Sequence, residues 1–273
     1  GIVYSDVIST VSETYAKEIQ TEEYGYGFDG IMRSVSDRLK GILNGIDYTE
    51  NDPETDKRID VNFGVDSIEK KKENKKLLQR SLGLEKRDVP MVCIISRLAN
   101  QKGFDILAGA MESLMQNDIQ FVVLGTGERE YEDMFRYYEN RWKGRFCSCI
   151  MFNDVLAQRI YASGDIFLMP SRFEPCGLGQ IFSLRYGTVP VVRKTGGLAD
   201  TIRHFDAESC EGNGFLFETY DSGGIIWALG EALKTYADKD KWNRLIKNCM
   251  ETKLSWKDSA AKYIELYNEM LNK

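Results

Sequence analysis

The sequence predicts an α/β fold, a doubly wound, Rossmann-like parallel sheet with helices on both faces and more helices at the C-terminus. From residue 89 on, short apolar runs alternate with amphipathic stretches, a pattern typical of parallel strands with crossover helices. Short turns containing Gly, Asp or Pro separate these units, which favours the doubly wound arrangement. The chain has 273 residues, of which 42% are hydrophobic, enough for a substantial core.

The expected elements follow one another in the order strand, helix, strand. The strands are expected at 89–96, 119–125, 145–152, 165–170, 188–193 and 214–217. The helices between them are expected at 104–116, 129–141, 155–163, 178–186 and 198–203. Three further helices, at 223–237, 240–252 and 257–271, close the chain, the last with apolar residues at helical spacing.

The first 88 residues follow a different pattern. VYSDVIST predicts one strand and SETYAKEI one helix with Ser12 as its N-cap, but a single strand–helix unit cannot bury its own faces, so this unit is expected to be orphaned. Residues 47–88 are expected to form a polar linker with a short helix. The charged run EKKKENKK in this segment predicts a solvated helix face.

Composition excludes several classes of function. The net charge of −6 argues against a nucleic-acid coat, and no apolar run is long enough to span a bilayer. Six cysteines without a CxxC pair, and a single histidine, offer no zinc set and favour reduced thiols in the cytoplasm. The chain starts at GIVYSDVIST, without an initiator Met or a signal peptide, and is expected to be cut from a longer protein.

Candidate functional residues lie in the loops that follow the strands, where open parallel sheets bind ligands. Arg97 and Lys102 follow the first strand and suit a pyrophosphate, unless they are ordinary surface cations. Gly127 lies in a Gly-rich turn after the second strand, a pattern that packing alone also produces. Phe152 ends the third strand and could stack on a base, although in isolation a core position is the commoner case.

The stretch SRFEPCGLGQ follows the fourth strand and places Glu174 as a carboxylate at the same edge. Gly177 and Gly179 let N–H groups at a helix start point toward an anion or a sugar hydroxyl. KTGGLADT, residues 194–201, combines Lys194 with paired glycines after the fifth strand. These loops together predict a nucleotide-sugar site, with a flat face for the base, cations for the diphosphate and acceptors for the sugar.

Hydrolase and metal-site patterns are missing from the sequence. It contains no G-x-S-x-G, no Walker loop and no HExxH. Cys176 has no histidine nearby in sequence to activate it, so it is not expected to be a nucleophile.

Four long stretches resemble bacterial glycogen synthases and plant starch synthases: VSETYAKEI, ILNGIDYTENDPETD, SRLANQKGFD and SRFEPCGLGQIFSLRYGTVPVVRKTGGLADTI. The resemblance covers essentially the whole chain. It implies a GT-B glycosyltransferase that moves glucose from ADP-glucose to the non-reducing end of an α-1,4-glucan with retention, without a cofactor. Phe182 stands where related retaining transferases carry a second glutamate, and the aromatic residue there favours the narrower family.

The resemblance assigns roles to particular residues. It implies that Arg97 and Lys102 bind the diphosphate, that Phe152 stacks on adenine and that Glu174 contacts the sugar. The remaining expected contacts to the donor come from Gly127, Cys176, Gly177, Leu178, Gly179, Thr195 and Gly196.

The resemblance also implies a division of the chain. Residues 1–46 would be the end of an N-terminal domain absent from this sequence, 47–88 a linker, and 89–255 the donor-binding domain. The helix at 256–273 would pack back on the absent domain. Such a chain is expected to bind ADP or ADP-glucose and to be catalytically incomplete.

Three alternatives stay open at this stage. The chain could be a nucleotide-binding or glucan-binding module without catalysis. It could belong to a transferase that uses UDP-sugars, because any base presents a stackable face. It could also belong to a phosphorylase-like enzyme with a lysine-bound pyridoxal phosphate, for which Lys194 would be the lysine to test.

Overall fold

The computed structural model of the chain, which describes residues 1–272, has a six-stranded parallel sheet at its centre. Its strands are β3 (Met91–Ile95), β4 (Gln120–Leu124), β5 (Phe146–Cys149), β6 (Ile166–Met169), β7 (Val189–Arg193) and β8 (Phe215–Phe217). Their spatial order is β5-β4-β3-β6-β7-β8, and all neighbours run parallel. The six predicted strands are confirmed, each somewhat shorter than its apolar run.

The strand order reverses between β3 and β6. From β3 the chain moves outward through β4 to β5, then returns to the other side of β3 to add β6, β7 and β8. A crevice opens outside the carboxyl ends of the strands at such a reversal, and ligands of doubly wound sheets bind there. The loops after β3 and β6 are therefore the expected place for a ligand.

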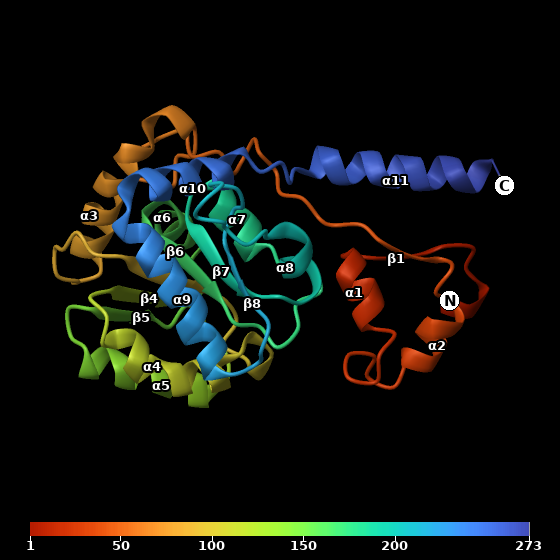
Figure 1. Cartoon of the computed structure of the whole chain (residues 1–273), viewed down its shortest axis with the longest axis horizontal. Helices are drawn as coiled ribbons and strands as arrows, with labels where there is room; N and C mark the ends of the chain where they lie inside the picture. The colour runs from red at the N-terminus through yellow and green to blue at the C-terminus, as the bar shows by residue number, and fades with distance from the viewer. Residues whose placement is uncertain (273) are drawn as a thin grey trace.

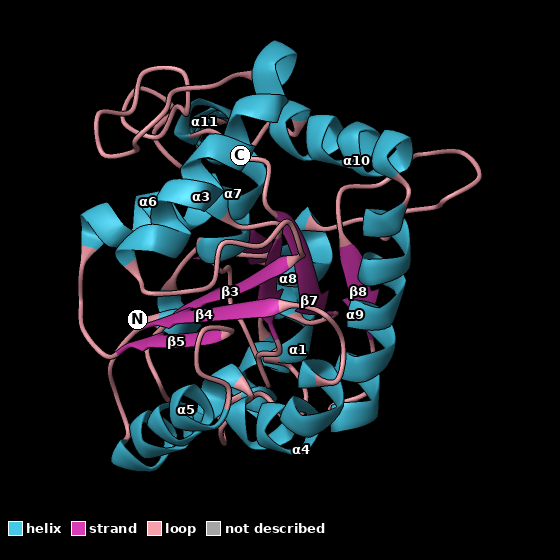
Figure 2. Cartoon of the chain, turned by 90° about the vertical axis from the view of Figure 1, so that its left-hand side faces the viewer, coloured by secondary structure: helices cyan, strands magenta, loops and turns pink. Residues whose placement is uncertain are grey.

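Helices cover both faces of the sheet (Figure 2). α4 (Phe104–Met115) and α5 (Arg129–Arg141) lie on one side, and α6 (Asp154–Ser163) and α7 (Gly179–Arg185) on the other. α8 (Gly196–Thr201) follows β7, α9 (Ser222–Ala237) follows β8, and α10 (Lys239–Glu251) comes directly after α9. Several start at side-chain caps; for example, Asn153 accepts a hydrogen bond from Leu156 N at 2.9 Å. The predicted crossover helices are confirmed.

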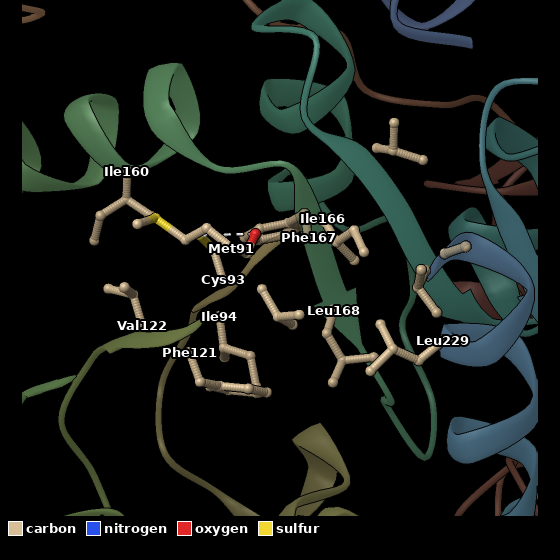
Figure 3. Packing of buried hydrophobic residues seen from close by; sticks show 14 of the residues in the cluster. Met91, Cys93, Ile94, Phe121, Val122, Ile160, Ile166, Phe167, Leu168 and Leu229 are labelled. Carbon is tan, nitrogen blue, oxygen red and sulfur yellow. Dashed lines mark hydrogen bonds between the residues drawn. The ribbon is translucent and has the colours of Figure 1, made fainter. Parts of the chain in front are cut away.

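The core is densest along β3 and β6. Met91, Val92, Cys93 and the facing strand residues Ile166 and Phe167 are completely buried. Figure 3 shows the side chains of Met91, Cys93, Ile166 and Phe167 packed among those of neighbouring strands and helices. Burial on both faces explains why these strands appear in the sequence as continuous apolar runs.

The charged run before β3 forms α3 (Lys71–Ser81), preceded by a 3-10 turn at Val65–Lys70. The prediction that this run is a solvated face is wrong for one side of the helix, where Lys71, Asn74, Lys75 and Gln79 are buried. Leu78 of the same helix belongs to the central core.

Hydrogen bonds to backbone oxygens compensate for the burial of the Lys71 ammonium. Its Nζ donates to the carbonyl oxygens of Tyr161 (3.3 Å), Ala162 (3.1 Å) and Tyr186 (2.7 Å) and lies 3.2 Å from the hydroxyl of Thr188. These carbonyls end α6 and α7, where they lack partners within their own helices. Lys71 therefore ties α3 to the sheet domain.

The N-terminal segment has its own small sheet. β1 (Ile8–Thr10) pairs in parallel with β2 (Leu39–Gly41), while α1 (Glu13–Glu18) and α2 (Asp29–Ser34) lie between them in the chain. Ser12 caps α1 as predicted, accepting a hydrogen bond from Tyr15 N at 2.9 Å. The expectation of an orphaned strand is wrong, because β2 was not recognised. Figure 1 shows this segment beside the large domain, with α1 facing α8.

The chain ends in α11 (Trp256–Leu271), which extends away from the sheet domain over the N-terminal segment (Figure 1). The hydroxyl of Ser259 donates to the carbonyl oxygen of Leu43 at 2.6 Å. Large apolar side chains on this helix are exposed: Trp256, Ile264, Tyr267, Met270 and Leu271. The division of the chain at 46, 88 and 255 stays a prediction. Among the helices of residues 1–272, none has the length and apolarity to cross a membrane.

Candidate functional site

A cavity of about 190 Å³ opens at the strand reversal, between the carboxyl ends of β3 and β6. Six of the predicted site residues line it: Arg97, Lys102, Glu174, Gly177, Leu178 and Gly179. They come from two loops more than seventy positions apart in the sequence. These six residues, predicted from their positions after the strands, therefore lie together in the folded chain.

Lys102 and Glu174 form the charged centre of this cavity. Lys102 Nζ donates to Glu174 Oε2 at 2.6 Å, and the hydroxyl of Ser171 donates to the same oxygen at 3.0 Å. The Glu174 side chain is only 8% exposed, so its position is well defined by these contacts. No described residue donates to Oε1 of Glu174, which leaves this oxygen able to accept a hydrogen bond from a sugar hydroxyl.

The close approach of the two loops depends on Gly103. Gly103 has φ +77°, and a Cβ there would lie 1.9 Å from the carbonyl oxygen of Pro170. Gln101 joins the same loops, since its Nε2 donates to Phe173 O at 3.1 Å and its carbonyl accepts from Arg172 N at 2.8 Å. Any side chain at Gly103 would push Lys102 away from Glu174.

A second cavity, of about 280 Å³, adjoins the first and is lined mainly by apolar atoms. The two share Ile95, Ser96 and Arg97, so the exposed Arg97 stands where they meet. Phe152 lines the second cavity and is 93% exposed, which excludes the core position that is common for phenylalanine. A flat aromatic face next to a cation is thus available to a planar ligand.

Gly127 serves packing rather than this cavity. A Cβ on Gly127 would lie 2.1 Å from the carbonyl oxygen of Leu98, and its N–H donates to Glu132 Oε1 at 3.1 Å. Its neighbours Gly125 and Thr126 line the second cavity instead. The Gly-rich turn therefore contributes to the site through residues next to the one predicted.

Thr195 and Gly196 lie behind the first cavity and do not line it. The Thr195 hydroxyl (2.8 Å) and the Gly196 N–H (2.9 Å) both donate to Oε1 of Glu18, from α1. A Cβ on Gly196 would lie 2.0 Å from the carbonyl oxygen of Glu174, so this turn supports the Glu174 loop from beneath.

Glu18 and Asp200 form a reciprocal pair of caps that sequence reasoning missed. Glu18 accepts from the start of α8, while Asp200, in α8, accepts from the Ser12 hydroxyl and from Thr14 N at 3.1 Å, at the start of α1. Carboxylates stabilise helix N-termini, which carry free N–H groups. Glu18 ends α1 and Asp200 lies near the end of α8, so no local pattern in the sequence reveals that each caps the start of the other helix.

Cys176 is buried behind the Glu174 loop, and burial raises the pKa of its thiol. The only histidine of the chain, His204, stacks on Trp227 instead. The thiol is therefore protonated and has no base beside it. All six cysteines are free, and the described residues contain no cluster of three or more potential metal ligands.

Comparisons with known proteins agree with this fold. The family model Glycosyl transferases group 1 matches residues 75–251, starting within α3, and the model Starch synthase catalytic domain matches residues 1–34. The chain is 57% identical to a glycogen synthase from Kosmotoga olearia over 272 residues and 54% identical to one from Thermosipho africanus over 275. It is covered completely by both and spans 57% of the length of each.

A solved structure is also close. The chain aligns over its whole length with the catalytic domain of starch synthase IV from Arabidopsis thaliana bound to ADP and acarbose, with a TM-score of 0.93 and 36% identity, and covers 57% of that structure. The family model covers more than half of the chain, including the sheet and both cavity loops. This chain belongs to the group 1 glycosyltransferase family.

Proposed function

We propose that the chain forms the donor-binding part of a retaining glucosyltransferase that transfers glucose from ADP-glucose to the non-reducing end of an α-1,4-glucan. The observation that carries the proposal is the pair of adjoining cavities that meet at Arg97. One offers an exposed aromatic ring and the other a cation and a carboxylate, the order in which a base, a diphosphate and a sugar follow one another in the donor.

Each part of the donor has a partner in this arrangement. The base would stack on Phe152, and the diphosphate would contact Arg97 and Lys102. Glu174 would accept a hydrogen bond from a glucose hydroxyl through its free Oε1 while Oε2 stays bound to Lys102. In this proposal Gly177 and Gly179 let the backbone approach the sugar closely.

The chemical step follows from the same charges. The C1–O bond to the diphosphate breaks as the acceptor hydroxyl adds to the same face of the sugar, and the leaving ADP carries the developing negative charge. Arg97 and Lys102 would place positive charge where this negative charge develops, and such electrostatic stabilisation is usually the largest single contribution to catalysis. The acceptor hydroxyl gives up its proton, for which the departing phosphate oxygen is the nearest base in this proposal.

Similarity supports adenine as the base. The relatives at 54% and 57% identity are glycogen synthases, and the starch synthase structure contains ADP. Because Phe152 could stack on any base, the structure of the cavity by itself fits UDP as well. We propose that the acceptor glucan is held mainly by a region that corresponds to the rest of the relatives' length. The absence of a cofactor and a cytoplasmic location stay predictions.

Calorimetric titration of the chain with ADP and, in parallel, with UDP tests the proposal. We expect ADP to bind more tightly than UDP, and Phe152→Ala to weaken ADP binding by about 5- to 150-fold through the loss of stacking. Tyr137→Ala is the matched control, because Tyr137 is an exposed aromatic residue on α5 that lines neither cavity. The proposal fails if neither nucleotide binds or if both variants bind ADP like the unchanged chain.

A binding module without catalytic activity would also bind ADP, so a second test, of glucose transfer, is needed. A full-length protein containing this chain should transfer glucose from ADP-glucose to maltoheptaose. If the full-length protein bound the nucleotide but transferred no glucose, the chain would be a nucleotide-binding module without catalytic activity.

A further inference from the structure

A separate cavity of about 570 Å³ lies beside the edge strand β8 and the start of α9. Its lining includes His204, Trp227, Lys194, Glu218 and Asp221. None of these residues lines the two cavities described above.

Two aromatic rings form a fixed platform in this cavity. Trp227 is 53% exposed, and the His204 ring lies nearly parallel to it, with 5.7 Å between the ring centroids and 14° between the planes. The backbone N–H of Leu216 donates to His204 Nδ1 at 3.1 Å, which places the imidazole proton on Nε2 and fixes the orientation of the ring. Phe215 meets the same imidazole edge-on at 5.5 Å. The platform is thus ordered without a ligand.

Polar groups surround the platform. Lys194 Nζ donates to Glu218 Oε1 at 2.7 Å, and both side chains are more than half exposed. Asp221 accepts from Gly224 N through Oδ1 at 2.8 Å to cap α9, and none of the described residues donates to its Oδ2. Carboxylate oxygens, an ammonium and the His204 imidazole therefore line the same cavity as the rings and can both donate and accept hydrogen bonds.

This combination matches the surface of a sugar. A pyranose ring has a face of C–H groups that packs on a flat aromatic ring, and a rim of hydroxyls that both donate and accept hydrogen bonds. We infer that the cavity around His204 and Trp227 is a second carbohydrate-binding site, which takes a segment of α-1,4-glucan. This inference rests on the proposed function for the identity of the sugar.

The position of the cavity favours the glucan over other ligands. Lys194 lines this cavity and directly precedes Thr195 and Gly196. A Cβ on Gly196 would lie 2.0 Å from the carbonyl oxygen of Glu174, so both cavities lie at the carboxyl ends of the strands. A glucan held here raises the concentration of chain ends near the donor cavity.

The His204 imidazole also makes strand addition at β8 unfavourable. Its Nδ1 accepts the hydrogen bond of the Leu216 N–H, so a strand from another protein cannot pair with that group.

The test is titration of the chain with maltoheptaose, with cellohexaose as the β-linked comparison. We expect Trp227→Ala to weaken maltoheptaose binding by at least about tenfold, and Trp227→Phe to weaken it less because a smaller ring remains. Trp256→Ala is the matched control, because Trp256 is 48% exposed on α11 and outside the cavity. Circular dichroism of each variant verifies that it is folded.

The outcomes separate this inference from the proposed function. Loss of maltoheptaose binding in Trp227→Ala, with ADP binding unchanged, supports the second site. Three results would overturn the second site and leave the donor proposal intact. The chain could bind ADP but not maltoheptaose, it could bind cellohexaose as tightly as maltoheptaose, or the Trp227→Ala and Trp256→Ala variants could bind maltoheptaose equally well. Trp227-dependent maltoheptaose binding without any nucleotide binding would keep the second site and reject the donor proposal. Dimerisation through Trp227 without maltoheptaose binding would make a second copy the occupant and reject the inference.

Discussion

Two lysine–carboxylate pairs stand at opposite ends of β6, and they differ in what else they contact. At the carboxyl end, Lys102 and Glu174 are 2.6 Å apart, and at the amino end Lys75 and Asp165 are also 2.6 Å apart. Asp165 additionally accepts from Met91 N at 2.7 Å, and Lys75 donates to the carbonyl oxygen of Val89. Both pairs line a cavity, of about 240 Å³ at the amino end and about 190 Å³ at the carboxyl end, but only the amino-end pair completes the hydrogen bonds of the backbone where a strand begins.

The comparison shows that pair distance alone does not identify a functional site. The bonds to the strand backbone and the position relative to the strand ends distinguish the two, because ligands of open parallel sheets bind beyond the carboxyl ends. The account therefore predicts that changes at the amino end reduce stability, and that changes at the carboxyl end reduce binding and catalysis.

The largest expected effect on stability comes from Lys75→Met. Removing the buried Lys75 leaves the partly buried Asp165 carboxylate without its cation, and breaking such a pair costs up to about 3–5 kcal/mol. Urea denaturation measures this change in the free energy of unfolding. Lys76→Met on the same helix is the control, because Lys76 pairs with Glu73 in solvent, and it should have little effect. Equal changes in the two variants would contradict the structural role of the amino-end pair.

The largest expected effect on catalysis comes from Arg97→Ala. In a full-length enzyme containing this chain, loss of one preorganised cation at the leaving diphosphate should lower turnover by about 10²- to 10³-fold. The free energy of unfolding should change little, because Arg97 is exposed. Steady-state kinetics provide the measurement, and near-normal turnover would remove Arg97 from the catalytic role.

A smaller effect, dependent on pH, is expected from Lys71→Met. The variant leaves the carbonyl oxygens of Ala162 and Tyr186, at the ends of α6 and α7, without their donor, at a cost of roughly 1–3 kcal/mol. Burial lowers the pKa of Lys71 to about 7. Above that pH the unfolded chain still holds a proton that the native state has lost, so unfolding takes up a proton and stability rises with pH.

The contribution of Lys71 should therefore increase between pH 7 and pH 9. We expect the difference in unfolding free energy between the unchanged chain and Lys71→Met to grow by up to roughly 1.4 kcal/mol per pH unit in this window. Urea denaturation at several pH values measures it. A difference that stays constant over this range would show that Lys71 keeps its charge in the native state.

Much of the sheet could be predicted because its strands are buried on both faces and therefore stand out as apolar runs. Arg97, Lys102, Glu174 and Phe152 could be identified from the same reasoning, since each follows a strand in a parallel sheet. Gly125 and Thr126 line the second cavity and Gly127 does not, because a Gly-rich turn does not reveal which glycine packs and which faces a cavity; the role of Gly127 stays a prediction.

The remaining features depend on contacts between distant segments. β2 has only three residues and no pattern of its own, so its pairing with β1 was missed. Glu18 meets Thr195 and Gly196 across more than 170 positions, and no local pattern encodes that contact. The burial of Lys71 and Lys75 had one sign in the sequence, because both share a helix face with Leu78 at intervals of three to four residues.

The central claim is that the carboxyl end of the sheet binds a nucleoside diphosphate, and one measurement tests it most directly. ADP is titrated into Lys102→Met and, in parallel, into Lys72→Met, which changes an exposed lysine at the amino end. The account predicts that Lys102→Met weakens ADP binding by about 10- to 150-fold, because a charge-assisted contact is lost, and that Lys72→Met has no effect. Equal ADP affinity in the two variants would contradict it.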